Sequence, residues 1–398
     1  MTRSGARDVA LLATCQALFL TSMSAVVAAA ALIGHSLADT KVLATLPIGI
    51  QFVMTMVATV PASLLMKRIG RRDGFTVGAT IGLAGALLGL WAIFEASFAL
   101  FCVGLALIGA ANGFAQYYRF AAADAASEAF RSRAISLVLA GGVIASVGPL
   151  LADWSKDLFA PIAFAGVFAT MAALYVATLV VLRFITIPPP DEEERSKGGR
   201  PLLTIMRQPT FIIAVLGSLV GYAMMSLLMT ATPLAMMFCG FGFSDSAQTI
   251  QWHVLGMFAP AFFTGHLIKR FGTKRIMACG ALLIGLCAAT NLQGIALANF
   301  QVALVLLGVG WNFLFTGGTT LVTEIHSPAE KAKTQAAHDF TVFTGVAAAA
   351  LLSGALHEAV GWQTMNYAVL PFLGIVLVGL AWLGLTGRRA AATPTAAE

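Results

Sequence analysis

Long apolar segments recur along the whole chain and limit its fold more than any other feature. A helix needs about 20 consecutive apolar residues to cross a bilayer, and twelve such segments can be read between polar breaks. The 398 residues allow about 33 for each helix with its connection. Only 11% of the residues are charged, against about a quarter in ordinary soluble domains. The sequence predicts an all-α membrane protein and excludes a soluble enzyme or a nucleic-acid-binding protein.

The twelve expected helices form two blocks of six. They are expected at about 9–34, 42–66, 74–94, 97–122, 134–153, 160–186, 210–238, 247–268, 275–293, 297–322, 334–357 and 364–386. The long polar break between the blocks begins with three prolines and continues with charged residues and glycines, which have nothing to bury. We expect an N-terminal six-helix bundle over 1–187, a cytoplasmic linker over 188–208, a C-terminal six-helix bundle over 209–387 and a short cytoplasmic tail over 388–398.

The distribution of Lys and Arg predicts the orientation. Of the 24 basic residues, only Lys41 and Lys156 fall in loops opposite the termini. Cytoplasmic loops carry an excess of Lys and Arg, so both termini and the linker are expected in the cytoplasm. This topology accounts for the net charge of +6 without an anionic partner. We expect a multi-pass protein of the bacterial inner membrane that functions as a monomer.

The two halves repeat each other. The loop Lys67-Arg68-Ile69-Gly70-Arg71-Arg72 returns 202 residues later as Lys269-Arg270-Phe271-Gly272-Thr273-Lys274. Such a parallel duplication is typical of transporters that bind substrate between their halves. Both loops resemble the signature between helices two and three of the major facilitator superfamily, although Lys67 and Lys269 replace its acidic residue. The resemblance implies twelve transmembrane helices as two six-helix pseudo-repeats, with no catalytic residue and no cofactor.

Methionine is unevenly distributed and suggests a metal site. Six of the 15 methionines lie between Met224 and Met257. On two consecutive expected helices, Met225 and Met229 are four residues apart, as are His253 and Met257, so each pair shares a helix face. Thioethers and imidazole favour copper, whereas methionine is equally a common filler of apolar cores.

The two motifs resemble those of the CcoA-type copper importers. That resemblance implies a copper importer that supplies cbb-type cytochrome c oxidase assembly, with Met225, Met229, His253 and Met257 as metal ligands. Copper is then the transported substrate, and downstream copper chaperones or transporters are possible partners. A sister group of the same fold transports riboflavin. Riboflavin or another small organic solute is therefore the alternative cargo, for which Tyr117, Tyr118, Trp252 and Trp311 offer aromatic walls. The other alternative is a copper-binding assembly factor that does not transport.

Further polar and sulfur residues are candidates for accessory roles. Cys239, Met236 and Met237 lie at the expected outer mouth and suggest a recruiting cluster, and Met23 and Gln51 correspond by the repeat to Met225 and His253. Four ionisable residues inside expected helices suggest coupling or gating, since charge in a membrane span is costly. They are His338, Asp339, Arg119 and Asp124.

Overall fold

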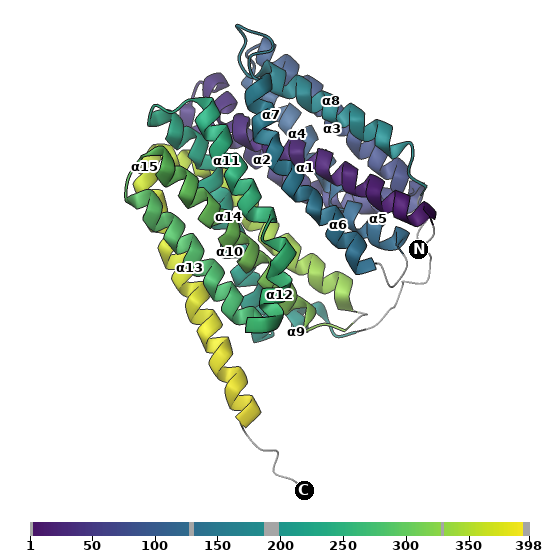
Figure 1. Cartoon of the computed structure of the whole chain (residues 1–398), viewed down its shortest axis with the longest axis vertical. Coiled ribbons are helices and arrows are strands. Elements are labelled where there is room, and N and C mark those ends of the chain that lie inside the picture. The colour runs from purple at the N-terminus through teal and green to yellow at the C-terminus, as the bar shows by residue number, and fades with distance from the viewer. Residues whose placement is uncertain (1–2, 127–130, 187–198, 328–329, 393–398) are drawn as a thin grey trace.

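The computed structural model describes residues 3–126, 131–186, 199–327 and 330–392, and this part of the chain is helical with connecting turns (Figure 1). Nine of its helical segments are long and apolar enough to span a membrane. Two further spans are built from broken helices, and the last of the nine segments holds two spans on either side of a kink at Gly361. The expected twelve-helix membrane fold is confirmed.

The N-terminal half holds the first six spans. Its elements are α1 (Arg3–Leu37), η1 (Lys41–Leu43), α2 (Leu46–Ile69), α3 (Arg71–Phe94), α4 (Phe98–Ala115), α5 (Tyr118–Ala125), α6 (Arg131–Ile144), η3 (Ala145–Val147), α7 (Gly148–Ser155) and α8 (Ala165–Leu182). The C-terminal half follows a short helix, α9 (Leu202–Met206). Its elements are α10 (Pro209–Phe238), α11 (Phe243–Phe258), α12 (Ala261–Phe271), α13 (Thr273–Leu292), α14 (Leu297–Thr323) and α15 (Lys331–Ala392).

Proline and glycine explain where the expected spans are interrupted. Pro149 has no N–H for the carbonyl of Ala145, and the fifth span changes to a 3-10 turn between α6 and α7. The Ala145 carbonyl instead accepts a hydrogen bond from the Ser24 hydroxyl at 2.5 Å. Pro260 separates α11 from α12 in the same way. The expected helices 334–357 and 364–386 are joined in α15, with a break at Gly361, whose φ is 77°.

The duplication is visible in matching backbone contacts. Gly70 and Gly272, 202 residues apart, share a φ of 90° at the turn between two helices, a conformation that glycine adopts without strain. Gly109 of α4 lies so close to α2 that a Cβ would come within 2.3 Å of the Gln51 carbonyl oxygen. In the other half, a Cβ on Gly308 would come within 2.5 Å of the His253 carbonyl oxygen. Gln51 and His253 therefore occupy equivalent positions in the two halves.

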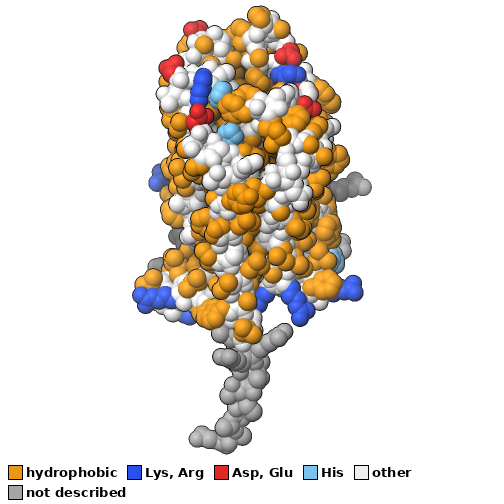
Figure 2. Space-filling view, turned by 90° about the vertical axis from the view of Figure 1, so that its left-hand side faces the viewer, with side chains coloured by type: hydrophobic (Ala, Val, Ile, Leu, Met, Phe, Trp, Pro, Cys, Tyr) orange, Lys and Arg blue, Asp and Glu red, His pale blue; other side chains and the backbone are white. Residues whose placement is uncertain are grey.

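The two ends of the molecule differ in charge. We call the end with the turns at Gly70 and Gly272 the basic end, and the opposite end, with the loops at 38–45 and 239–242, the far end. On the face in Figure 2, Lys and Arg gather at the basic end and most acidic side chains at the far end. This separation agrees with the accumulation of Lys and Arg on one side, from which the orientation was predicted. Which end faces the cytoplasm stays a prediction.

The halves meet from mid-depth to the far end. At the far end, the Thr45 hydroxyl of the N-terminal half accepts a hydrogen bond from the Gly354 N–H at 2.9 Å, and the Ser244 hydroxyl donates to Asp153 at 2.7 Å. At mid-depth, the Thr344 hydroxyl lies 3.4 Å from the Met56 sulfur. Toward the basic end, the helices of the two halves diverge (Figure 1). These contacts close the far end.

At the basic end, Arg200 fastens the chain before α9 to the turn before α15. Its guanidinium donates to both carboxylate oxygens of Glu330, at 2.9 and 2.8 Å, and to the Ile325 carbonyl at 2.8 Å. The Ser327 N–H donates to the same carboxylate at 3.0 Å. Hydrogen bonds from Arg200 and from the Ser327 N–H hold the pKa of Glu330 well below its usual range.

Glu330→Gln is expected to lower the melting temperature at neutral pH, because the amide keeps at most part of these hydrogen bonds and no charge. A carboxyl whose pKa is depressed by folding stabilises the protein above its unfolded pKa, and that contribution is lost as pH falls through the folded pKa. The difference from wild type should therefore shrink below about pH 4.3, the ordinary glutamate value. Thermal unfolding of the purified wild type and variant, from neutral pH to below about pH 4.3, measures this difference in melting temperature. Glu324→Gln, at an exposed residue of the same end, is the control, and an equal loss in both variants would contradict the expectation.

Candidate functional site

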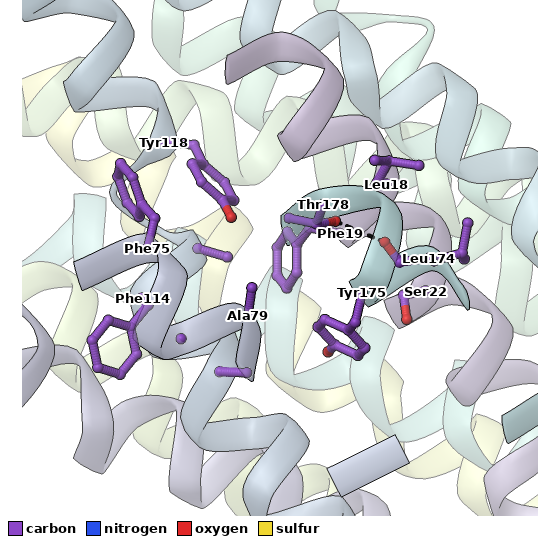
Figure 3. A pocket seen from close by; sticks show the side chains of 13 residues that line it. Leu18, Phe19, Ser22, Phe75, Ala79, Phe114, Tyr118, Leu174, Tyr175 and Thr178 are labelled. Atoms are coloured by element: carbon purple, nitrogen blue, oxygen red, sulfur yellow. Dashed lines mark hydrogen bonds between the residues drawn. The ribbon is translucent and has the colours of Figure 1, made fainter. Parts of the chain in front are cut away.

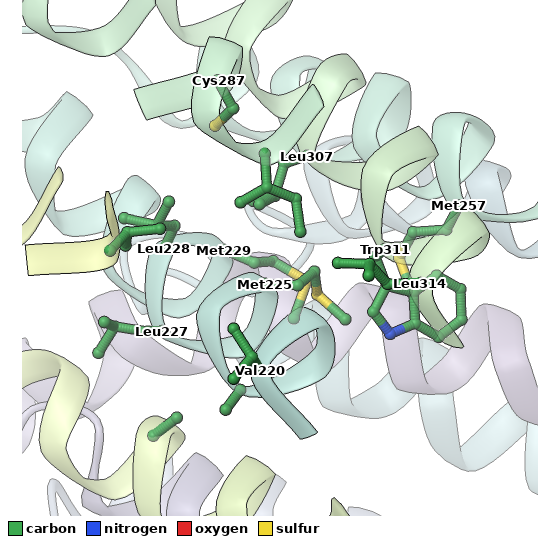
Figure 4. Close-up of a cluster of buried hydrophobic side chains, with 14 of the residues drawn as sticks. Val220, Met225, Leu227, Leu228, Met229, Met257, Cys287, Leu307, Trp311 and Leu314 are labelled. Carbon is green, nitrogen blue, oxygen red and sulfur yellow. The ribbon is translucent and has the colours of Figure 1, made fainter. Parts of the chain in front are cut away.

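The four residues predicted as metal ligands lie on two helices of the C-terminal half. Met225 and Met229 are on α10, and His253 and Met257 are on α11. All four are buried, with exposed fractions of 1%, 6%, 0% and 8%. The three methionines belong to one apolar cluster together with Trp311 of α14. In Figure 4 the thioethers of Met225 and Met229 point toward the part of the cluster that holds the indole.

His253 is the one member of this quartet with an open hydrogen-bonding position. Its Nδ1 lies 2.8 Å from the carbonyl oxygen of Leu304 on α14. A carbonyl only accepts, so Nδ1 carries the proton and donates, and Nε2 is left as an acceptor. Nε2 is buried and has no hydrogen-bond partner within the described structure. Gly308 permits this geometry because it lets α14 approach the backbone of His253.

An aromatic cluster adjoins the methionines. The Trp311 and Phe315 rings are stacked, with centroids 5.4 Å apart and planes at 8°. The Tyr222 ring meets both edge to face, at 5.2 and 5.4 Å. Phe258 of α11 lies 6.1 Å from Trp311, and Phe343 of α15 lies 5.8 Å from Tyr222. We call these five residues, from four helices of the C-terminal half, the aromatic cluster.

Unpaired polar groups occur at equivalent positions of the two halves. Both side-chain atoms of the Gln51 amide, and both of the Asn112 amide, are buried without a partner in the described structure, as is Trp311 Nε1. Gln51 is 1% exposed and Asn112 is 2% exposed. Gln51 corresponds to His253, and Asn112 corresponds to Trp311 by the same 199-residue offset that relates Gly109 to Gly308. Leaving a buried polar group unpaired costs about 1–3 kcal/mol, so these groups are candidates for contact with a bound solute.

Of the residues predicted for coupling or gating, His338 and Asp339 are paired. His338 Nδ1 lies 2.9 Å from a carboxylate oxygen of Asp339, and His338 Nε2 lies 3.0 Å from the Ser218 hydroxyl of α10. The His338 ring is 6.4 Å from that of Phe315, next to the aromatic cluster. Arg119 is in the other half, with its guanidinium 4.9 Å from the Phe120 ring. The side chain of Asp124 lies outside the described residues.

The predicted outer cluster is divided in the structure. Met236 is fully buried in the same apolar core as Met225, whereas Met237 lines a cavity at the far end. Cys239 is partly exposed just after α10, and its burial raises the pKa of the thiol. Met23 is partly buried between two apolar clusters of the N-terminal half.

A small cavity inside the N-terminal half is shown in Figure 3. It lies among α1, α3, α4, α5 and α8, and its volume of about 10 Å³ is the space of one water molecule. Tyr118, one of the aromatic residues suggested for the alternative cargo, lines this cavity. Its size excludes it as the site of an organic solute.

Sequence reasoning missed Asn112 and four members of the aromatic cluster, Tyr222, Phe258, Phe315 and Phe343. An amide inside an apolar span is itself a signal of function, and Asn112 carries that signal. Of the aromatic residues suggested, only Trp311 lies in the aromatic cluster. Tyr117 donates its hydroxyl to the Thr59 carbonyl at 3.0 Å, and Trp252 is 45% exposed.

Two duplicated six-helix halves, closed at one end and carrying unpaired polar groups at equivalent positions, define a membrane transporter rather than an enzyme. Comparison with known families agrees. The model of the Major Facilitator Superfamily matches residues 11–251 and 245–398, and the chain belongs to this superfamily.

Relatives and solved structures extend this assignment. The riboflavin transporter RfnT of Brucella anthropi is 41% identical over 377 residues, which cover 94% of this chain and 95% of that protein. The uncharacterized MFS-type transporter YddS of Bacillus subtilis is 30% identical, over 87% of this chain and 84% of its own. A bacterial homologue of the human lysosomal transporter Spinster, in an inward-facing and occupied conformation, superposes with a TM-score of 0.75 over 99% of this chain and 100% of its own. Its 15% sequence identity supports the fold alone.

The prediction of copper import is wrong. The 41% identical relative is a riboflavin transporter, and the CcoA-type subfamily, copper as substrate, copper chaperones as partners and oxidase assembly find no support. Four-residue spacing places two methionines on one helix face, and core packing selects that spacing as readily as metal binding does. The three thioethers are packed in an apolar core with leucines such as Leu228 and Leu307 (Figure 4). Among the described residues, no group of three or more His, Cys, Asp or Glu is placed to hold a metal ion.

Proposed function

We propose that this chain transports riboflavin across the membrane. The observation that carries the proposal is its 41% identity, over nearly the full length of both chains, to the riboflavin transporter RfnT. The superfamily contains carriers of unrelated solutes, so the fold alone does not choose the cargo. The residues of the candidate site provide the second, chemical argument.

Riboflavin requires two kinds of contact. Its isoalloxazine is a planar system of three fused rings, and its ribityl chain and pyrimidine edge carry hydroxyls, carbonyl oxygens, ring nitrogens and one N–H. Ligand sites of this kind combine apolar and aromatic walls with a few placed polar groups. The aromatic cluster, with Met225, Met229 and Met257, would contact the ring faces. Their flat, polarisable side chains suit such a surface.

The polar edge of riboflavin would be met from both halves. From the N-terminal half, Gln51 and Asn112 each offer an NH2 group as donor and a carbonyl oxygen as acceptor, and Trp311 Nε1 offers a donor from the other half. His253 Nε2, an acceptor by the tautomer assigned above, suits the one N–H of the ring. We place the quartet first expected to bind metal in this role, with its methionines as apolar wall and its histidine as acceptor.

The arrangement of the two ends suggests the state of the transporter. If the basic end is cytoplasmic, as the positive-inside rule predicts, then closure of the far end makes this conformation inward-facing. Alternating access would open the far end by moving one half against the other about the site. We propose a monomer in a bacterial inner membrane with both termini in the cytoplasm.

Uptake of radiolabelled riboflavin tests the function. Cells that cannot make riboflavin and lack their own importer should accumulate it when they express this chain, and should grow on lower riboflavin concentrations than cells with the empty vector. An excess of unlabelled riboflavin should abolish accumulation of the label, whereas excess copper should leave it unchanged. Accumulation no greater than in vector cells, with the protein present in the membrane, would reject the proposal.

A further inference from the structure

The far end contains a cavity between the two halves that is separate from the central candidate site. Its volume is about 280 Å³, close to the lower limit of about 300 Å³ for small-molecule sites. The N-terminal half contributes Leu32, His35 and Ser36 of α1, together with Phe164. The C-terminal half contributes residues from the end of α10 to the first turn of α11. Several lining residues, Ser36 among them, are exposed or partly exposed, so the cavity opens to the far-end surface.

Two aromatic rings from opposite halves form one wall of this cavity. Phe164 and Phe243 meet edge to face with centroids 5.0 Å apart. Phe164 has a φ of 66°, a left-handed conformation that costs a bulky residue free energy and is concentrated at functional sites. Its N–H donates to the Lys156 carbonyl at 2.8 Å, and it precedes the first turn of α8. The backbone thus places this ring against Phe243 of the C-terminal half.

An unpaired hydroxyl is buried in the wall of the same cavity. Ser246, in the first turn of α11, is 2% exposed and lines the cavity, and its hydroxyl has no hydrogen-bond partner in the described structure. Its neighbour Ser244 is paired with Asp153 of the other half. Because Asp153 also binds Lys156 at 2.9 Å, the wall that carries Ser246 is tied to the loop that positions Phe164. A solute in this cavity would contact the two aromatic rings and, once the Ser246 side chain rotates toward it, one hydroxyl to donate to or accept from.

We propose that this cavity is a second substrate site, which binds the planar heteroaromatic ring of the solute at the far end. The inference rests on the proposed riboflavin transport and adds to it a place where the ring is held before the halves exchange conformations. The volume matches a ring system better than a whole riboflavin molecule, so the ribityl chain extends into solvent. The far-end site therefore recognises the ring and ignores the chain.

Binding of riboflavin and of lumichrome, the related ring system without a ribityl chain, tests the far-end site. Purified full-length protein in nanodiscs is titrated with each fluorescent ligand, in wild type and in Phe243→Leu and Ser246→Ala. In each variant the Kd of both ligands should rise by the same factor, roughly three- to tenfold, which is the equivalent of one lost hydrogen bond or ring contact. In uptake, KM should rise by a similar factor while kcat is unchanged, because the central site is intact.

Phe94→Leu is the matched control, since Phe94 also packs edge to face at the far end, against Phe159 at 5.6 Å, and does not line the cavity. It should bind both ligands as wild type does. Normal binding in all three variants would overturn the far-end site while leaving riboflavin transport standing. A loss for riboflavin but not for lumichrome would also overturn it, because the contact would then be with the ribityl chain. Absence of riboflavin uptake by wild type would instead reject the proposed function itself.

Discussion

Asn112→Leu is expected to give a more stable protein that transports riboflavin less well. The Asn112 amide is buried and unpaired, so an apolar side chain of similar size removes a desolvation cost of about 1–3 kcal/mol. Transport should fall because the solute loses a hydrogen bond worth about 0.5–1.5 kcal/mol, which corresponds to a decrease in kcat/KM of roughly two- to thirteenfold. Melting temperature and initial uptake rate, measured on the same preparation, give both effects.

Asn366→Leu is the matched control for the expected rise in stability and fall in transport. Asn366 is also fully buried, but its amide is satisfied by Asn291 at 2.8 Å and by the Trp362 carbonyl at 2.9 Å. Its replacement should lower the melting temperature and leave KM for riboflavin unchanged in the protein that remains folded. If Asn112→Leu is also destabilised, with unchanged KM, then Asn112 serves packing and does not touch the solute.

The fold could be predicted from the sequence because the bilayer requires features that are visible in the sequence. Spans need long apolar runs, and basic residues accumulate on one side. The repeated loops around Gly70 and Gly272 gave the duplication, which the matching φ of 90° confirms. The breaks were harder to place, since Pro149 and Pro260 interrupt hydrogen bonds without interrupting the apolar run.

The candidate site could be predicted only in part from the sequence. Sequence reasoning shows the chemistry of each residue but not which groups lie next to it in the fold. His253 was predicted to be functional, and its place beside α14 leaves one ring nitrogen open. The methionines were assigned to copper from their spacing, which packing explains equally well. Whether an amide such as Asn112 is paired depends on neighbours distant in the chain. The stacking of Trp311 on Phe315, which are four residues apart on α14, was available from helix periodicity alone.

The same facts explain why a soft-metal motif and the flavin site proposed here can be confused. Sulfur side chains are polarisable and pack well against aromatic faces, so a surface for a flat ring collects the residues that Cu(I) also favours. The discriminating feature is what surrounds the sulfurs. Here stacked aromatic rings lie next to the sulfurs, and uncharged amides occupy the equivalent positions of the other half. Both suit an uncharged heteroaromatic solute better than a metal ion.

Trp311→Leu is expected to cause the largest loss of riboflavin binding, by about tenfold or more, the equivalent of about 1.4 kcal/mol. It removes both the aromatic face, worth about 0.5–1.5 kcal/mol beyond its buried area, and the unpaired Nε1 donor. Trp311→Phe keeps a ring that can stack on Phe315 and should lose binding to an intermediate extent. Its stability should change little, because removing the unpaired buried Nε1 offsets the packing lost around the smaller ring. Fluorescence titration of riboflavin against the purified protein measures both variants.

Trp91→Leu separates these effects from the general loss of an indole. Trp91 is 54% exposed on α3, and its Nε1 donates to Glu95 at 3.2 Å on the surface. Binding by this variant should equal that of wild type. The ordering wild type, then Trp311→Phe, then Trp311→Leu requires that the ring face and the donor each contact the solute. Equal affinity in all of them, with folded protein in each case, would show that Trp311 only fills the core and that the ring of the solute binds elsewhere.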